Sequence, residues 1–193
     1  PVAVSITDDE SPQIIVSSKG LSLTEGGSAK TYNVKLNSVP IGGDVTVDLV
    51  ILGNDATLSL NRLTFTASDW QTDKLVTVTP NPAVNDNVET APRDLMLTHT
   101  VSGANFNSAT SVMVPITIAD DDIPTISVAA TTVNEGDEGT DPIITFTASL
   151  SNATYKDVSF NYAVNATSSA TGGTDYTALT GSVLTIPANS NSA

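Results

Sequence analysis

The sequence predicts an all-β chain of tandem antiparallel β-sandwiches. Two observations carry this prediction: short segments that alternate apolar with polar residues follow one another along the chain, and one acidic segment occurs twice in the same surroundings. Alternation with a period of two places one face of each strand against a core and leaves the other face in water. No segment of useful length has the periodicity of an amphipathic helix.

The predicted strands are short, rich in Val and Thr, and bounded by clusters of Gly, Pro, Asn or Ser, such as Ile41-Gly42-Gly43 and Pro80-Asn81-Pro82. In chain order they are residues 14–16, 30–36, 44–50, 63–66, 74–79, 94–101 and 112–118. Seven or so strands at roughly ten-residue spacing are typical of a sandwich of immunoglobulin-like size.

The repeated segment is an acidic run followed by a proline. It occurs at residues 8–12 and again at residues 120–124, so that its first acids, Asp8 and Asp120, are 112 positions apart. An alternating apolar stretch precedes each run, another follows it, and a Glu-Gly pair comes later in each copy, at Glu25 and at Glu135. A unit that recurs at this distance indicates a tandem array of domains with acids at its joints.

This repeat predicts the domain organisation. Residues 1–10 form the last strand of a preceding repeat, residues 11–122 a complete sandwich, and residues 123–193 a sandwich truncated at its C-terminus, with early strands at 143–150, 158–164 and 182–186. A sandwich without its closing strands exposes an unpaired sheet edge. We therefore expect neighbouring repeats of the same chain as partners, and strand exchange between chains as a hypothesis, in which residues 2–6 of one molecule complete the open sheet of another.

Composition restricts the classes of partner. With 39% hydrophobic and 15% charged residues, the chain can build a core and is expected to fold. Its net charge of -14, from 21 acidic against 7 basic residues, disfavours nucleic acid and anionic membranes and favours a cation. No cysteine is present, which excludes disulfides and thiolate metal sites, and no apolar run is long enough for direct membrane insertion.

Catalysis is not expected. The single histidine, His99, lies within a predicted strand without an accompanying serine or cysteine motif. The acids fall on loops rather than around a cleft, and aromatic residues, at 5% of the chain, are too few to line a carbohydrate site. The sequence therefore favours a binding or structural module over an enzyme.

The ordered motifs resemble one family. They consist of an acidic turn with proline, a strand, Leu/Val-x-Glu-Gly, a Gly-rich loop ending in Thr174-Asp175-Tyr176, the strand of residues 182–186, and a closing strand into Asp120-Asp121-Asp122. This order of motifs resembles the Calx-β repeat. That family occurs in sodium-calcium exchangers, in integrin β4 and in many large bacterial surface and adhesion proteins. The resemblance implies an immunoglobulin-like sandwich and is preferred here to a cadherin-like one.

The resemblance also implies a calcium site, because exchanger-type Calx-β domains bind Ca²⁺ at one end of the sandwich with acids from separate loops. The matching positions in the first sandwich are Glu25, Asp55, Asp86, Glu89, Asp120, Asp121 and Asp122. Corresponding acids of the flanking repeats are Asp8, Asp9, Glu10, Glu135 and Asp175. The family usually has a denser acidic stretch than residues 89–92, which leaves the number of ions open.

The chemistry of the acids agrees with a calcium site. Ca²⁺ takes six to eight oxygen ligands, and carboxylates about 5 Å apart repel each other by on the order of 3 kcal/mol per pair when no cation is bound. Because residues 120–122 also form the predicted joint, binding would stiffen it. The expected function is that of a calcium-binding structural or adhesive repeat of a large extracellular or cell-surface protein; a sensor module of an exchanger-like membrane protein and an accessory domain of a secreted enzyme remain alternatives.

Overall fold

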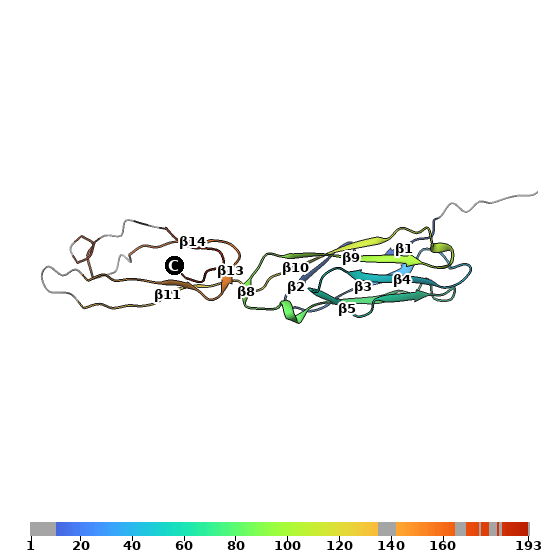
Figure 1. Ribbon diagram of the computed structural model, residues 1–193, viewed down its shortest axis with the longest axis horizontal. Coiled ribbons are helices and arrows are strands. Elements are labelled where there is room, and N and C mark those ends of the chain that lie inside the picture. Colours follow the sequence, from blue (N-terminus) through green and yellow to red (C-terminus); the bar gives the residue numbers. More distant parts are fainter. Residues whose placement is uncertain are drawn as a thin grey trace, which may run out of the picture. The chain divides into compact units, whose positions relative to one another are not determined.

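A computed structural model describes residues 11–134, 142–164, 169–173, 175–177, 181 and 183–192. The prediction of an all-β chain with antiparallel sandwich architecture is confirmed (Figure 1). The residues group into two compact units, one made of Pro1–Asn85 and Pro92–Asp121, the other of Asp86–Ala91 and Asp122–Ala193. No helix in the described part of the chain has the length and apolar character needed to cross a membrane.

The first unit contains two sheets. The four-stranded sheet has the order β1 (Ile14–Val16), β3 (Lys30–Leu36), β7 (Lys74–Pro80) and β5 (Ala56–Leu58). The five-stranded sheet has the order β2 (Leu21–Thr24), β10 (Val112–Ala119), β9 (Arg93–Ser102), β4 (Val45–Ile51) and β6 (Arg62–Phe65). Every pairing in these sheets is antiparallel except that of β2 with β10, which is parallel. Short 3-10 turns occur at η1 (Pro82–Val84) and η2 (Ala104–Phe106).

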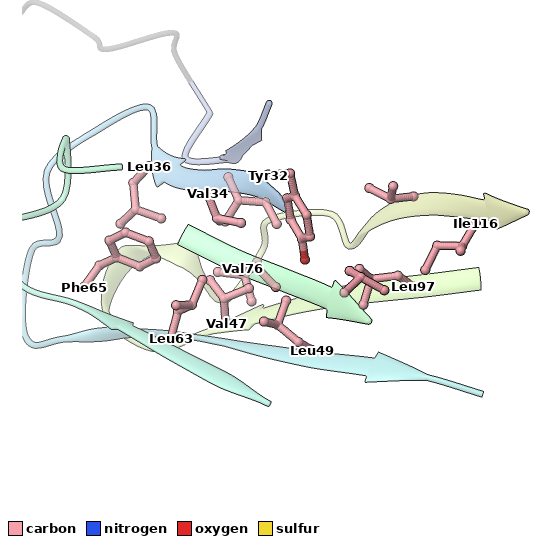
Figure 2. Packing of buried hydrophobic residues seen from close by; sticks show 14 of the residues in the cluster. Tyr32, Val34, Leu36, Val47, Leu49, Leu63, Phe65, Val76, Leu97 and Ile116 are labelled. Carbon is pink, nitrogen blue, oxygen red and sulfur yellow. The ribbon is translucent and has the colours of Figure 1, made fainter. Parts of the chain in front are cut away.

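The core of the first unit lies between these sheets, as Figure 2 shows. In β3, alternate residues Tyr32, Val34 and Leu36 are buried, and β4 buries Val45, Val47 and Leu49 in the same way. The alternation read from the sequence therefore corresponds to the core-facing side of each strand. Trp70, the single tryptophan, packs partly buried against this cluster.

One polar pair crosses this core. The hydroxyl of Tyr32, on β3, lies 2.9 Å from Nε2 of His99, on β9, and Nδ1 of His99 lies 3.1 Å from the carbonyl oxygen of Val112. Because a carbonyl can only accept, Nδ1 carries the proton and Nε2 accepts from Tyr32. Burial lowers the pKa of His99 and raises that of Tyr32, so both remain neutral. His99 is thus a satisfied core residue.

The described residues of the second unit, taken by itself, form three two-stranded sheets. The strand β11 (Ile126–Val128) pairs with β12 (Ala148–Leu150), and β14 (Val158–Asn161) pairs with β15 (Val183–Ile186), both antiparallel. The strand β8 (Val88–Glu89) pairs in parallel with β13 (Ala153–Thr154). A small core forms around Ala148, Leu150 and Ile186. Residues 2–6, on which the strand-exchange hypothesis depends, lie outside the described part of the chain.

The strands of the second unit are shorter than the sequence predicts. The predicted strand 143–150 is a strand only over its last three residues, because its partner β11 is itself three residues long. The apolar side chains before it stay exposed, and Phe146 is 59% exposed. Together with Val128, Phe160 and Tyr162, Phe146 lines an open apolar hollow of about 630 Å³.

Candidate metal centre

The Glu-Gly turn brings the first acid of the site into place. The strand β2 ends at Thr24, and its parallel pairing with β10 sets Thr24 beside Ala119. The backbone N–H of Glu25 then donates to the carbonyl oxygen of Ala119 at 2.9 Å. Glu25 therefore arrives next to the acidic run that follows β10, although the two segments lie far apart in the sequence.

Glycine is needed at the next position. Gly26 has a φ of +60°, in the left-handed region that side chains other than glycine rarely adopt. A Cβ at this residue would also lie 2.8 Å from Oδ1 of Asn85. The Glu-Gly pair is thus a local structural requirement: the glycine makes the tight turn that orients Glu25.

Three carboxylates meet at this end of the sheet. Glu25, Asp121 and Asp122 each offer an oxygen, and these oxygens lie within 4.8 Å of one another. Glu25 is only 1% exposed, whereas Asp121 is exposed and Asp122 is half-buried. A donor set of carboxylate oxygens alone fits a hard cation such as Ca²⁺ rather than zinc or copper, which favour nitrogen and sulfur.

A cation of the protein itself touches this cluster. Arg93 begins β9 and lies opposite Ile118 of β10, so that β10 separates it from the strand that leads to Glu25. Nη1 of Arg93 forms an ion pair with Oε1 of Glu25. The other oxygen, Oε2, is buried and has no hydrogen-bond partner among the described residues. A buried carboxylate requires a charge partner, which Arg93 supplies at Oε1 through the ion pair, while Oε2 has neither an ion pair nor a hydrogen bond among the described residues.

Two further predicted ligands of the first unit lie outside this group. Asp120 directly follows β10 and is half-buried, but it is not a member of the group of carboxylates within 4.8 Å. Asp55 precedes β5, where its carbonyl oxygen accepts from the N–H of Asn81 at 2.9 Å, and its carboxylate is likewise not a member. A ligand role for either residue stays a prediction.

Asp86 and Glu89 group with the second unit, whereas the sequence motifs predict them as ligands of the first sandwich. Oδ1 of Asp86 accepts from the N–H of Val88 at 2.8 Å. Oε1 of Glu89 lies 2.7 Å from Nζ of Lys156 and, chiefly through this hydrogen bond, raises the pKa of Lys156. Both carboxylates therefore have local partners, and their role as metal ligands also stays a prediction.

The acids of the flanking repeats add no further ligand to the described part of the chain. Asp8, Asp9, Glu10 and Glu135 lie outside the described residues. Asp175 is described: its Oδ2 accepts from the N–H of Thr171 at 2.7 Å, and its own N–H donates to the carbonyl of Thr171 at 2.8 Å. This exposed carboxylate closes a local turn.

Arg93 is a functional residue that the sequence motifs do not single out. The available signal was its place at the start of the predicted strand 94–101 in a chain with only 7 basic residues. When one strand begins at the end of a sheet where an antiparallel neighbour stops, the charged residues that flank the two strands lie close together. A single basic residue at the start of the predicted strand 94–101 is therefore a candidate partner for the acidic run.

Comparisons with known proteins yield structures but no family. No family model matches the sequence, and no curated protein matches it. Similar solved structures include the apo form of the Calx CBD1 domain, with 14% identity, a TM-score of 0.43, and coverage of 58% of this chain and 100% of that chain. The E. coli chaperone DraB has 6% identity and a TM-score of 0.42 over 56% of this chain, which spans about half (55%) of DraB.

A third similar structure is the CsuC-CsuE chaperone-tip adhesion subunit complex of Acinetobacter baumannii. It has 9% identity and a TM-score of 0.41, and the matched region spans 92% of this chain and 87% of the other chain. At TM-scores below 0.5, these similarities carry no argument about ligands or partners.

Proposed function

We propose that the chain contains a calcium-binding module that serves as a structural or adhesive repeat of a large extracellular or cell-surface protein. The observation that supports this proposal most directly is the carboxylate of Glu25, which is 1% exposed, lies with Asp121 and Asp122, and keeps one oxygen without a hydrogen bond among the described residues. The net charge of -14 adds a favourable field for cations.

The ion would be held by Glu25, Asp121 and Asp122, with water or backbone carbonyls as further ligands. When bound, Ca²⁺ supplies the positive charge that offsets the repulsion between these carboxylates. It would tie the turn after β2 to the residues that follow β10. Because residues 120–122 also form the predicted joint between repeats, the ion would stiffen that joint.

A mechanical role follows from the place of the acids. Repeats gain reach by repetition, and their length depends on how freely each joint bends. Ions at the acidic runs would convert a flexible string of sandwiches into a stiffer one. Extracellular modules typically bind Ca²⁺ with dissociation constants of roughly 10⁻⁴ to 10⁻³ M, and we expect an affinity in this range.

Calorimetric titration of the whole chain with Ca²⁺, paired with thermal melts in chelator and in calcium, tests this proposal. A free calcium concentration ten times the dissociation constant should raise the free energy of unfolding by about 1.4 kcal/mol. Asp121→Asn, which alters an exposed ligand, should weaken binding, whereas Asp44→Asn, at an exposed acid outside the cluster, should not. Absence of both heat and a melting shift in the unmodified chain would refute the calcium assignment.

A further inference from the structure

Arg93 places a positive charge against the acidic cluster. Its side chain is 24% exposed, and its Nη1 pairs with Oε1 of a glutamate that is almost completely buried. β9, β10 and β2 are hydrogen-bonded neighbours in that order, so the sheet itself positions both partners of the pair. The guanidinium is covalently attached and permanently charged, and it therefore neutralises part of the cluster whether or not an ion is present.

The remaining charge suits one divalent ion. When all groups are ionised, the three carboxylates and the one guanidinium leave a formal charge of -2. Arg93 occupies one oxygen of Glu25, while the second oxygen has no hydrogen bond among the described residues. Oε1 is therefore paired with the protein's own cation, and Oε2 is open to a ligand.

We infer, building on the calcium site proposed above, that Arg93 serves as a tethered cation that holds Glu25 when calcium is absent and limits the site to a single divalent ion of reduced affinity. Without Arg93, the buried carboxylate would lack a charge partner, which strongly destabilises a folded protein. With Arg93, the same charge repels an incoming ion. The side chain of Arg93 therefore raises the stability of the calcium-free protein and lowers its affinity for calcium.

The size of the effect follows from the spacing of the cluster. The carboxylate oxygens lie within 4.8 Å of one another, which sets the scale of separation between an ion among them and the guanidinium. Even with the dielectric constant of bulk water, a unit charge about 5 Å from a divalent ion changes its binding constant by about tenfold or more. Removing the charge of Arg93 should therefore strengthen calcium binding.

A purely structural role predicts the opposite sign. If Arg93 only orients Glu25 as a ligand, its removal disorders the site and calcium binds more weakly. The direction of the affinity change thus separates a tethered cation from a positioning residue. Arg93→Lys is the matched control because it keeps the charge while it changes the shape of the side chain.

The experiment compares calcium titrations and thermal melts of the whole chain for the unmodified protein, Arg93→Gln and Arg93→Lys. Arg93→Gln should melt lower in chelator, bind calcium at least about tenfold more tightly and recover its melting temperature when calcium is added. Arg93→Lys should bind within about threefold of the unmodified chain. If Arg93→Gln does not fold in chelator, it is refolded in calcium and then titrated. The double variant Glu25→Gln/Arg93→Gln removes both charges. It should fold in chelator and bind calcium no more tightly than the unmodified chain.

Four outcomes separate the two proposals. Tighter binding by Arg93→Gln in a chain that already binds calcium supports both. Unchanged or weaker binding by Arg93→Gln overturns the tethered cation and leaves the calcium module standing. Binding by Arg93→Gln alone supports the tethered cation and overturns calcium binding by the natural chain, because Arg93 would then replace the ion altogether. No binding by any variant overturns both proposals.

Discussion

Replacing Tyr32 with phenylalanine tests the polar pair in the core of the first unit. Tyr32 is 3% exposed and His99 is completely buried, and the hydroxyl of Tyr32 donates to Nε2 of His99 over 2.9 Å. The ring of phenylalanine keeps the packing, so the change removes a single oxygen. Nε2 is then a buried acceptor without a donor, because Nδ1 of the same ring already bonds the carbonyl of Val112.

An unsatisfied buried acceptor destabilises a protein by about 1–3 kcal/mol, so Tyr32→Phe should lower the free energy of unfolding by that amount. The melting temperature should fall by roughly 4 °C for each kcal/mol in a domain of this size. Urea unfolding followed by the fluorescence of Trp70 measures the effect, since this single tryptophan packs against the core of the first unit. The slope of the free energy with urea should stay unchanged.

The control is a double-mutant cycle with His99→Leu. Each single variant leaves a buried polar atom without its partner, whereas Tyr32→Phe/His99→Leu removes both, so the double variant should lose less stability than the sum of the single changes. Additive losses, or a loss below about 0.5 kcal/mol for Tyr32→Phe, would refute the interpretation that the pair is a coupled hydrogen bond.

Three further predictions concern pH, the core and the site. Burial lowers the pKa of His99, so at low pH the unfolded chain binds a proton that the folded chain does not. The free energy of unfolding should therefore fall as pH drops below about 6.5. In urea titrations at pH 7.5 and 5.5, His99→Leu should remove this contribution to the pH dependence of the free energy of unfolding. Phe65→Ala should destabilise the first unit by about 3–5 kcal/mol in the same assay, because Phe65 is completely buried, while Leu52→Ala, at a side chain 75% exposed, should change it by less than about 0.5 kcal/mol. Gly26→Ala should destabilise the chain and reduce the calcium-dependent rise in melting temperature. Gly42 also has a positive φ but has open space around it, so Gly42→Ala should leave that rise intact.

The strands were the most predictable part of the fold. Residues 30–36 were predicted as a strand, and β3 has the same bounds, because seven alternating residues define their buried face without reference to other segments. The strands β2 and β5, with four and three residues, were not predicted. Segments this short contain too few periods to be recognised, and they exist as strands because β10 and β7 provide their hydrogen-bond partners.

The candidate site was predictable only in its members, not in their grouping. Glu25, Asp121 and Asp122 were all candidates, but so were Asp55 and Asp86, and nothing in residue type or spacing distinguishes the acids that meet from those that do not. Asp86 lies with the second unit. Arg93 was overlooked because its partner is 68 positions away in the sequence, and local pattern carries no information about such pairs.

The sequence by itself determined the all-β class, the core-facing side of the longer strands, the acidic character and the Glu-Gly turn, since each of these depends on neighbouring residues and on the steric limits of the backbone. Only the tertiary structure decided that β2 runs parallel to β10 while β9 flanks β10 on its other side. That arrangement joins segments distant in the chain through long-range hydrogen bonding and core packing. It brings a buried glutamate, an acidic run and an arginine to the same end of the sheet, and so decides which charges face each other.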